Sequence, residues 1–134
     1  MKSAIVTGCS RGIGLAICEM LLDDGWQVFG VSRTSPAVAS HGFVWLPVDV
    51  SETSDLWMLS GKPVEALIHC AGSQVPVGPI ADSDEAAWVQ SIQTNLIGTY
   101  RIVKATLPLL KRSEDARILL YSGGGAFSPR PNYS

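Results

Sequence analysis

The 134-residue sequence has few charged residues, no basic cluster and no long hydrophobic run. Charged residues make up 16% of the chain, 12 Asp and Glu outnumber 10 Lys and Arg, and the longest basic run is Lys111-Arg112. We therefore do not expect nucleic acid as a partner. No apolar stretch reaches the roughly 18 residues of a membrane span, and the N-terminus shows no signal-peptide pattern, so we expect no membrane association.

Cysteine is also scarce. Cys9, Cys18 and Cys70 are odd in number and widely separated, which predicts neither a disulfide framework nor a metal site and favours the reducing cytoplasm. Hydrophobic residues make up 46% of the chain, which excludes an intrinsically disordered protein at this low charge. We expect one globular domain, residues 1–134, with a small molecule as its partner.

Short apolar segments alternate with helical patterns along the chain. The segments that predict buried strands are residues 4–6, 27–31, 43–46, 64–69 and 117–121. A first helix follows the first strand, with apolar residues at helical spacing from Ile13 to Leu21, and Gly25 ends it. Solidly apolar strands that alternate with helices predict an α/β fold, a doubly wound parallel sheet covered on both faces.

A second, longer helix is expected from about residue 85 to 107. Ser83 or Asp84 is the expected cap, and Pro108 marks the expected end or kink. The apolar residues that we expect to form its buried stripe are Val89, Ile92, Leu96, Val103 and Leu107.

The most informative segment is residues 7–14, Thr-Gly-Cys-Ser-Arg-Gly-Ile-Gly. Its glycines lie between the first strand and the first helix, with the spacing G-x3-G-x-G. Such glycines allow a tight turn, let backbone N–H groups approach a pyrophosphate, and direct a helix N-terminus at its charge. The segment predicts a nucleotide-binding site.

These residues resemble the short-chain dehydrogenase/reductase family, whose oxidoreductase members carry the signature Thr-Gly-x3-Gly-Ile-Gly. Asp49-Val50 resembles the adenine-contacting segment of that family, and Ala71-Gly72 resembles the end of its Asn-Asn-Ala-Gly motif. The resemblance implies a Rossmann-like sheet in the order 3-2-1-4-5, without the C-terminal strands of the family fold. The expected cofactor-binding residues are Gly8, Ser10, Arg11, Gly12, Ile13, Gly14, Arg33, Asp49, Val50, Cys70, Ala71 and Gly72.

Charge at the end of the second strand predicts the choice of cofactor. Proteins that select NAD place an acid there for the ribose hydroxyls, whereas a 2′-phosphate requires a cation. Here the strand ends in Val31-Ser32-Arg33, and Arg11 offers a second cation. We therefore expect NADP(H) to be preferred, with NAD(H) as the other possible cofactor.

The resemblance also implies catalytic residues. Asn95, in an Asn-x-x-Gly motif, would organise a water, and Ser122 would hydrogen-bond the substrate oxygen, although the family serine can also correspond to the slot of Gly123. The tyrosine acid of the family and the lysine four residues after it are missing, because no Tyr-x3-Lys occurs in the sequence. Tyr133-Ser134 could begin a Tyr-Ser-x-x-Lys, but Tyr133 follows Ser122 by only 11 residues, slightly short of the usual family separation, so the alternative is a tyrosine beyond residue 134.

Two further residues depart from the family or have two interpretations. His69-Cys70 replaces the Asn-Asn of the motif, and we interpret His69 as a structural hydrogen-bonding residue without a catalytic role. Cys9 lies in the glycine segment, where it is either a redox thiol of low pKa or a small packing residue, and we favour packing.

Two functional classes follow. The first is an NADP-dependent oxidoreductase acting on a carbonyl or secondary alcohol, present here as a fragment that lacks the Tyr-Lys pair and is therefore inactive alone. The second is a short, non-catalytic nucleotide-binding or interaction module. A methyltransferase is less favoured, because it would need an acid near the end of the second strand. The long helix resembles the helix through which the family dimerises, which implies a homo-oligomer.

Overall fold

The computed structural model describes residues 1–52, 56, 59 and 61–133. Its strands are β1 (Ser3–Thr7), β2 (Gln27–Ser32), β3 (Phe43–Pro47), β4 (Ala66–His69) and β5 (Arg117–Leu120). The α-helices are α1 (Gly12–Asp23), α2 (Glu85–Ile92) and α3 (Gly98–Leu110). A π-helical segment, Gln93–Ile97, joins α2 to α3, and single 3-10 turns occur at Ile80–Asp82 and Gly124–Ala126.

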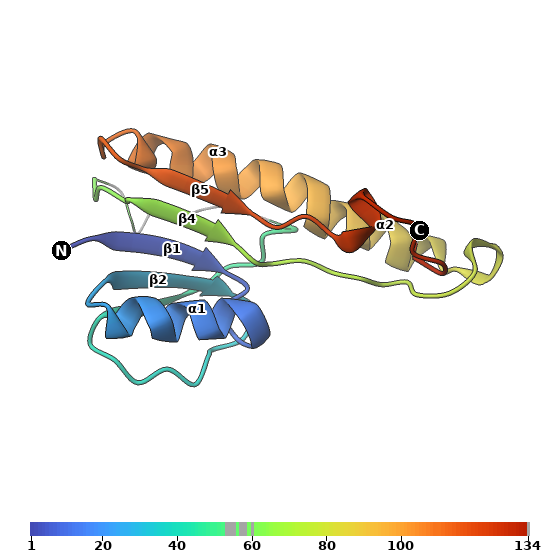
Figure 1. Cartoon of the computed structure of the whole chain (residues 1–134), viewed down its shortest axis with the longest axis horizontal. Helices are drawn as coiled ribbons and strands as arrows, with labels where there is room; N and C mark the ends of the chain where they lie inside the picture. The colour runs from blue at the N-terminus through green and yellow to red at the C-terminus, as the bar shows by residue number, and fades with distance from the viewer. Residues whose placement is uncertain (53–55, 57–58, 60, 134) are drawn as a thin grey trace.

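The five strands form one parallel sheet in the order β3-β2-β1-β4-β5, which confirms the predicted doubly wound topology (Figure 1). Each strand coincides with a predicted segment to within two residues. β1 is buried along its whole length, because β2 and β4 pair with its two edges and helices cover its two faces. The carboxyl ends of the strands point toward the same edge of the sheet (Figure 1).

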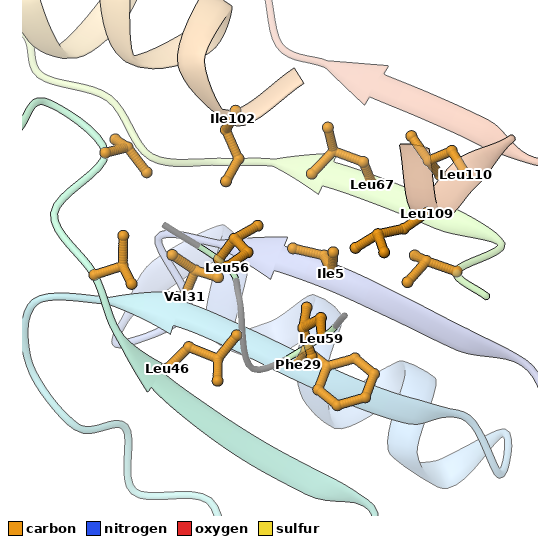
Figure 2. Close-up of a cluster of buried hydrophobic side chains, with 13 residues drawn as sticks. Ile5, Phe29, Val31, Leu46, Leu56, Leu59, Leu67, Ile102, Leu109 and Leu110 are labelled. Carbon is orange, nitrogen blue, oxygen red and sulfur yellow. The ribbon is translucent and has the colours of Figure 1, made fainter. Parts of the chain in front are cut away.

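Alternation along the strands separates two hydrophobic cores. Ile5 faces the core that contains Ile102 of α3, whereas its neighbours Ala4 and Val6 face the core that contains Cys18 of α1. Because successive strand side chains point to opposite faces, α1 and α3 cover opposite faces of the sheet. Figure 2 shows the α3 side, where aliphatic residues of the strands meet Ile102, Leu109 and Leu110.

The long helix is present, but its predicted buried stripe is wrong. Asp84 caps it by accepting a hydrogen bond from the Ala87 N–H, and the helix continues past Pro108 to Leu110. Of the predicted stripe, Val89, Ile92, Leu96 and Leu107 are exposed and Val103 is only partly buried. The residues that α3 buries are Gly98, Ile102, Thr106, Leu109 and Leu110.

The reason for this error is that the helix has two apolar faces. The face with Gly98 packs on the sheet, and a Cβ atom at this position would lie 3.2 Å from the Val50 carbonyl oxygen. Glycine at this position thus lets the helix approach Val50 closely, whereas the larger apolar residues of the other face are exposed. Hydrophobic periodicity alone does not distinguish a face that packs from one that stays exposed.

β5 forms one edge of this sheet, and its side chains are exposed along the strand. Ile118, Leu119 and Leu120 are each between 43% and 48% exposed, so an apolar surface lies beside β4. Among the helices in the described residues, none combines the length and apolar character needed to cross a membrane.

The two faces of the long helix differ in their expected contribution to stability. Ile102 is fully buried and Leu96 is 63% exposed. We expect Ile102→Ala to lower the free energy of unfolding by about 2–5 kcal/mol and Leu96→Ala by less than about 0.5 kcal/mol. Urea denaturation of the two variants at low protein concentration measures both values. Equal losses in the two variants would contradict the assignment of the buried face.

Candidate functional site

The carboxyl ends of β1, β2 and β4, with the segment after β3, surround a cleft of about 950 Å³. All twelve residues that the sequence predicted for cofactor binding line it. The structure therefore brings together four segments that are far apart in the sequence. They begin at Gly8, Arg33, Asp49 and Cys70. Further lining residues, which the sequence analysis did not identify, are Val31, Ser32, Thr34, Val48, Ser73, Gln74, Val75, Gln90 and Thr94.

The glycine segment forms a tight loop between β1 and α1. Gly8 has φ of 68°, a left-handed conformation, and its N–H donates to the Val31 carbonyl at 2.8 Å. A Cβ atom at Gly14 would lie 2.2 Å from the Gly8 carbonyl oxygen, so a larger residue cannot fit without moving the loop. These two glycines bring the start of α1 directly against the end of β1.

The N-terminus of α1 opens into the cleft. Its N-cap, Arg11, makes no side-chain capping hydrogen bond, and Gly12, Ile13 and Gly14 of the first turn all line the cleft. The first backbone N–H groups of a helix have no partner within the helix and carry partial positive charge. This arrangement suits a bound phosphate group.

Two arginines add positive charge to the cleft. Arg11 and Arg33 are both exposed lining residues, and within the described residues neither forms an ion pair with a carboxylate. The guanidinium groups are therefore free of competing anions. A planar guanidinium suits a phosphate oxygen pair, which it binds through charge-assisted hydrogen bonds.

A buried hydroxyl holds the turn that carries Arg33. Ser32 Oγ donates to the Thr34 carbonyl at 2.7 Å and accepts from Trp45 Nε1 at 3.2 Å and from the Cys9 thiol at 3.2 Å. The end of β2 is thus tied to β3 on one side and to the glycine loop on the other. The direction of the chain at Arg33 follows from these contacts.

Cys9 is fully buried, in accord with the packing interpretation, and it also has an unusual pKa. A hydrogen bond with the Cys18 thiol lowers the pKa of Cys9 from 9.0 to about 7, against the effect of burial. The same hydrogen bond, together with burial, raises the pKa of Cys18. Burial, with a smaller effect of Cys9, raises the pKa of Cys70, which lines the cleft.

Asp49 and Val50 form the wall that follows β3. Asp49 Oδ1 accepts hydrogen bonds from the Ser51 N–H at 2.9 Å and from the Ser51 hydroxyl at 2.7 Å. The Gln90 side chain of α2 donates to the same hydroxyl at 3.2 Å. The aspartate that the resemblance assigns to adenine therefore also fixes the local turn against α2.

His69 is 5% exposed and uses both ring nitrogens. Its Nδ1 lies 2.6 Å from Thr7 Oγ1 on β1, and its Nε2 lies 3.0 Å from Thr99 Oγ1 on α3. Burial lowers the pKa of His69 below 6.5. These contacts agree with the prediction of a structural hydrogen-bonding residue.

Charged side chains on the elements around His69 have partners elsewhere. On α3, Arg101 donates to the Ser51 carbonyl and the Lys104 ammonium lies over the Tyr100 ring. On β5, Arg117 pairs with Asp115. Desolvation thus accounts for the lowered pKa of His69.

Asn95 lies in the π-helical segment and holds the loop after β4. Its Oδ1 accepts from the Ser73 N–H at 2.7 Å, and its Nδ2 donates to the Ser73 carbonyl at 2.7 Å. Ser73 lines the cleft, whereas Asn95 does not. π-Helical turns occur frequently at functional sites, because they re-aim one residue of a helix. Periodicity gave no signal for this turn.

Ser122, the other expected catalytic residue, does not line the cleft either. Ser122 is exposed and lies two residues beyond Leu120, the partner of His69 in the sheet register. Tyr133 is also outside the wall, where its ring packs under Arg130 and its backbone bridges to Val77. The predicted nucleotide residues therefore share one cleft, while Ser122 stands at the neighbouring strand end.

The fold and the cleft define a class of protein, the doubly wound dinucleotide-binding domains, whose sites lie where the strand order reverses. The family model of short chain dehydrogenases matches residues 2–134. The chain belongs to the short-chain dehydrogenase family.

Individual relatives agree with this membership. The chain is 30% identical to L-fucose dehydrogenase of Mus musculus over 136 residues, which covers 93% of the chain and 50% of that protein. It is 30% identical to a probable NADP-dependent dehydrogenase of Haemophilus influenzae over 138 residues, or 93% of the chain and 55% of that protein. The chain thus spans about half the length of these curated relatives.

A solved relative has the same fold. Ligand-free aldohexose dehydrogenase of Thermoplasma acidophilum superposes with a TM-score of 0.76 at 31% identity. The match covers 87% of this chain and 47% of that one. The half of the family fold that this chain matches is the half that holds the glycine loop.

The lowered pKa of His69 predicts a pH-dependent stability. The folded protein binds this proton less readily than the unfolded chain, so the titration of His69 costs no stability above about pH 6.5 and lowers stability as the pH drops toward the folded pKa. The slope from one such group reaches at most about 1.4 kcal/mol per pH unit. Urea denaturation between about pH 5.5 and 7.5 measures it.

The test variant is His69→Gln, which removes this titration. We expect the stability of His69→Gln to vary less with pH than that of the wild type. Parallel pH profiles for wild type and His69→Gln would contradict the linkage.

Proposed function

We propose that this chain is the cofactor-binding part of an NADP(H)-dependent oxidoreductase that exchanges hydride with a carbonyl or secondary alcohol. The observation that carries the proposal is the cleft. An uncapped helix N-terminus converges there at the strand ends with two arginines that have no carboxylate partner among the described residues. Family membership supplies the reaction class. The dehydrogenase names of the relatives support it.

Each wall of the cleft has a proposed role. The N–H groups of the glycine loop, Gly8 to Gly14, bind the pyrophosphate, and Arg33 and Arg11 bind the 2′-phosphate. Asp49 and Val50 contact the adenine. The remaining proposed contacts are with Ser10, Cys70, Ala71 and Gly72.

The proposed catalytic residues lie beside the cleft. The nicotinamide, when bound, supplies the hydride. Asn95 organises a water near the loop after β4, and Ser122 hydrogen-bonds the substrate oxygen, which polarises the carbonyl. The Ser122 position at the end of β5 suits this role, since β5 adjoins the strand whose end borders the cleft.

NADP(H) is the proposed cofactor, with NAD(H) as the second choice. The turn after β2 presents Arg33 where an NAD-selective protein has an acid, and Ser32 holds this turn through three side-chain contacts. The Haemophilus influenzae relative, a probable NADP-dependent dehydrogenase, supports the same choice.

A non-catalytic nucleotide-binding module is the second candidate function. The observation that favours it is the lack of any Tyr-x3-Lys in the 134 residues, because hydride transfer to a carbonyl requires a proton donor. The reading frame that follows the codon of residue 134 distinguishes the candidates. A downstream Tyr-x3-Lys supports the enzyme, and a stop codon supports the module.

We also propose a homo-oligomer in the cytoplasm. The exposed face of the long helix presents the apolar residues Trp88, Val89, Ile92, Leu96, Tyr100 and Leu107. A contiguous apolar face of this kind suits a protein interface. The three cysteines are free, which suits a reducing compartment.

The cofactor preference can be tested at Arg33. We expect Arg33→Ala to weaken NADPH binding about tenfold or more, because a charge-assisted hydrogen bond to the 2′-phosphate is lost, and to change NADH binding less than about twofold. Nucleotide fluorescence titration measures both dissociation constants. Arg112→Ala, beyond the end of α3, is the matched control and should change neither. Tighter binding of NADH than NADPH by the wild type would refute the preference.

The role of the missing proton donor can be tested with the 134-residue chain alone. We expect weak NADPH binding and no NADPH oxidation with a panel of aldehydes and ketones, because the chain has no Tyr-x3-Lys. Absorbance of NADPH measures turnover. Activity above the protein-free control would contradict the expectation, and would assign the proton donor to a residue within the chain.

A further inference from the structure

The hydrogen bonds around His69 fix the positions of its protons. Thr99 has one hydroxyl proton, and it is donated to the Asn95 carbonyl at 2.6 Å. Thr99 Oγ1 must therefore accept a hydrogen bond from His69, so Nε2 carries a proton. On the other side, Thr7 Oγ1 accepts from the Ala71 N–H at 3.1 Å and donates to Nδ1. The neutral Nε2–H tautomer satisfies all these groups.

The alternative tautomer leaves two groups without partners. If Nδ1 carried the proton, Nε2 would become an acceptor, and the Thr99 hydroxyl could no longer donate to the Asn95 carbonyl. The Thr7 hydroxyl would also lose the acceptor for its proton. Since Thr7 is fully buried, an unpartnered hydroxyl there is costly.

These hydrogen bonds extend from His69 to the wall of the cleft. The Asn95 backbone carbonyl accepts a hydrogen bond from the Thr99 hydroxyl, and the Asn95 side chain binds both backbone groups of Ser73. Ser73 follows His69 by four residues and lines the cleft. At the other end of this series of hydrogen bonds, Thr7 directly precedes the glycine loop. The imidazole of His69 thus connects the glycine loop, the proposed phosphate site, to the π-helical turn that contains Asn95.

We propose that His69, as the neutral Nε2–H tautomer, is a positioning residue that holds the Asn95 turn and the Ala71–Ser73 wall in register with the glycine loop. This role rests on the proposed function, since it serves the nucleotide cleft. An imidazole has its acceptor and its donor on opposite edges, which lets it span from β1 to α3. A side-chain amide has both at one end, so the Asn of the family motif cannot reproduce this geometry.

The wild-type chain supplies the first test, without any substitution. The chain contains two histidines, and a His41→Asn variant assigns their resonances. We expect long-range ¹H–¹⁵N spectra at neutral pH to show Nε2 of His69 protonated and Nδ1 unprotonated. A protonated Nδ1, or a mixture of tautomers, would overturn the proposal even if every variant failed to fold.

The second test removes the acceptor on α3. We expect Thr99→Val to mix the His69 tautomers, to lower hydrogen-exchange protection of the Ser73 N–H at least about fivefold, and to weaken NADPH binding by a similar factor, because the ordered wall is less populated. Thr99→Ser keeps the hydroxyl and should restore all three. Thr106→Val is the matched control, since Thr106 is buried in the same helix and donates only to α3 carbonyls.

The outcomes separate the two proposals. The tautomer and hydrogen-exchange measurements require no nucleotide, so they test the role of His69 even if the wild type binds no NADPH. Absence of NADPH binding by the wild type would refute only the proposed function. Wild-type protection of Ser73 in Thr99→Val, or an equal loss in Thr106→Val, would overturn the positioning role. Loss in Thr99→Val with restoration in Thr99→Ser would support it.

Discussion

Parallel pairing of β1 with both β2 and β4 is the constraint on which the site depends. The strand order reverses at β1. The connection after β1 therefore runs over one face of the sheet, and the connection after β4 runs over the opposite face. The connections therefore diverge and leave a cleft between them. Gly8 and Gly14 complete this geometry, because their lack of side chains lets α1 begin against the end of β1. The residues that line the cleft surround this contact between the end of β1 and the start of α1.

Polar contacts below the cleft connect its walls. Ser32 ties the turn after β2 to Cys9 and Trp45, and His69 ties β1 and β4 to α3. Both groups are buried, where an unsatisfied polar atom would cost about 1–3 kcal/mol. Because each group contacts more than one element, a displacement of one wall would break hydrogen bonds to its neighbours. A long, charged ligand that spans the cleft thus meets a preorganised surface.

The sequence predicts most of the fold because its signals are local. Buried strands appear as apolar runs, and the glycine loop has its own spacing, so these elements were predicted from the residues themselves. The strand order, and the lining residues Asp49, Val50, Cys70, Ala71 and Gly72, were predicted from the family resemblance. The buried face of the long helix was not predicted correctly from apolar periodicity, because Thr106 and Gly98 are buried and Leu96 is exposed. Nor could the partners of His69 be predicted, since Thr7 and Thr99 lie 62 and 30 residues away. Long-range side-chain bonds leave no periodic pattern.

The site is asymmetric, and the asymmetry has a physical origin. At the ends of β1, β2 and β4, buried hydroxyl, thiol or imidazole groups bind neighbouring elements and hold the backbone in place. At the end of β5, Tyr121 and Ser122 are exposed beside an apolar strand. Buried hydrogen bonds therefore hold the walls proposed for the nucleotide, whereas the proposed serine lies on an exposed strand end. The residues proposed for nucleotide binding and the serine proposed for catalysis thus lie on parts of the fold that are held in different ways.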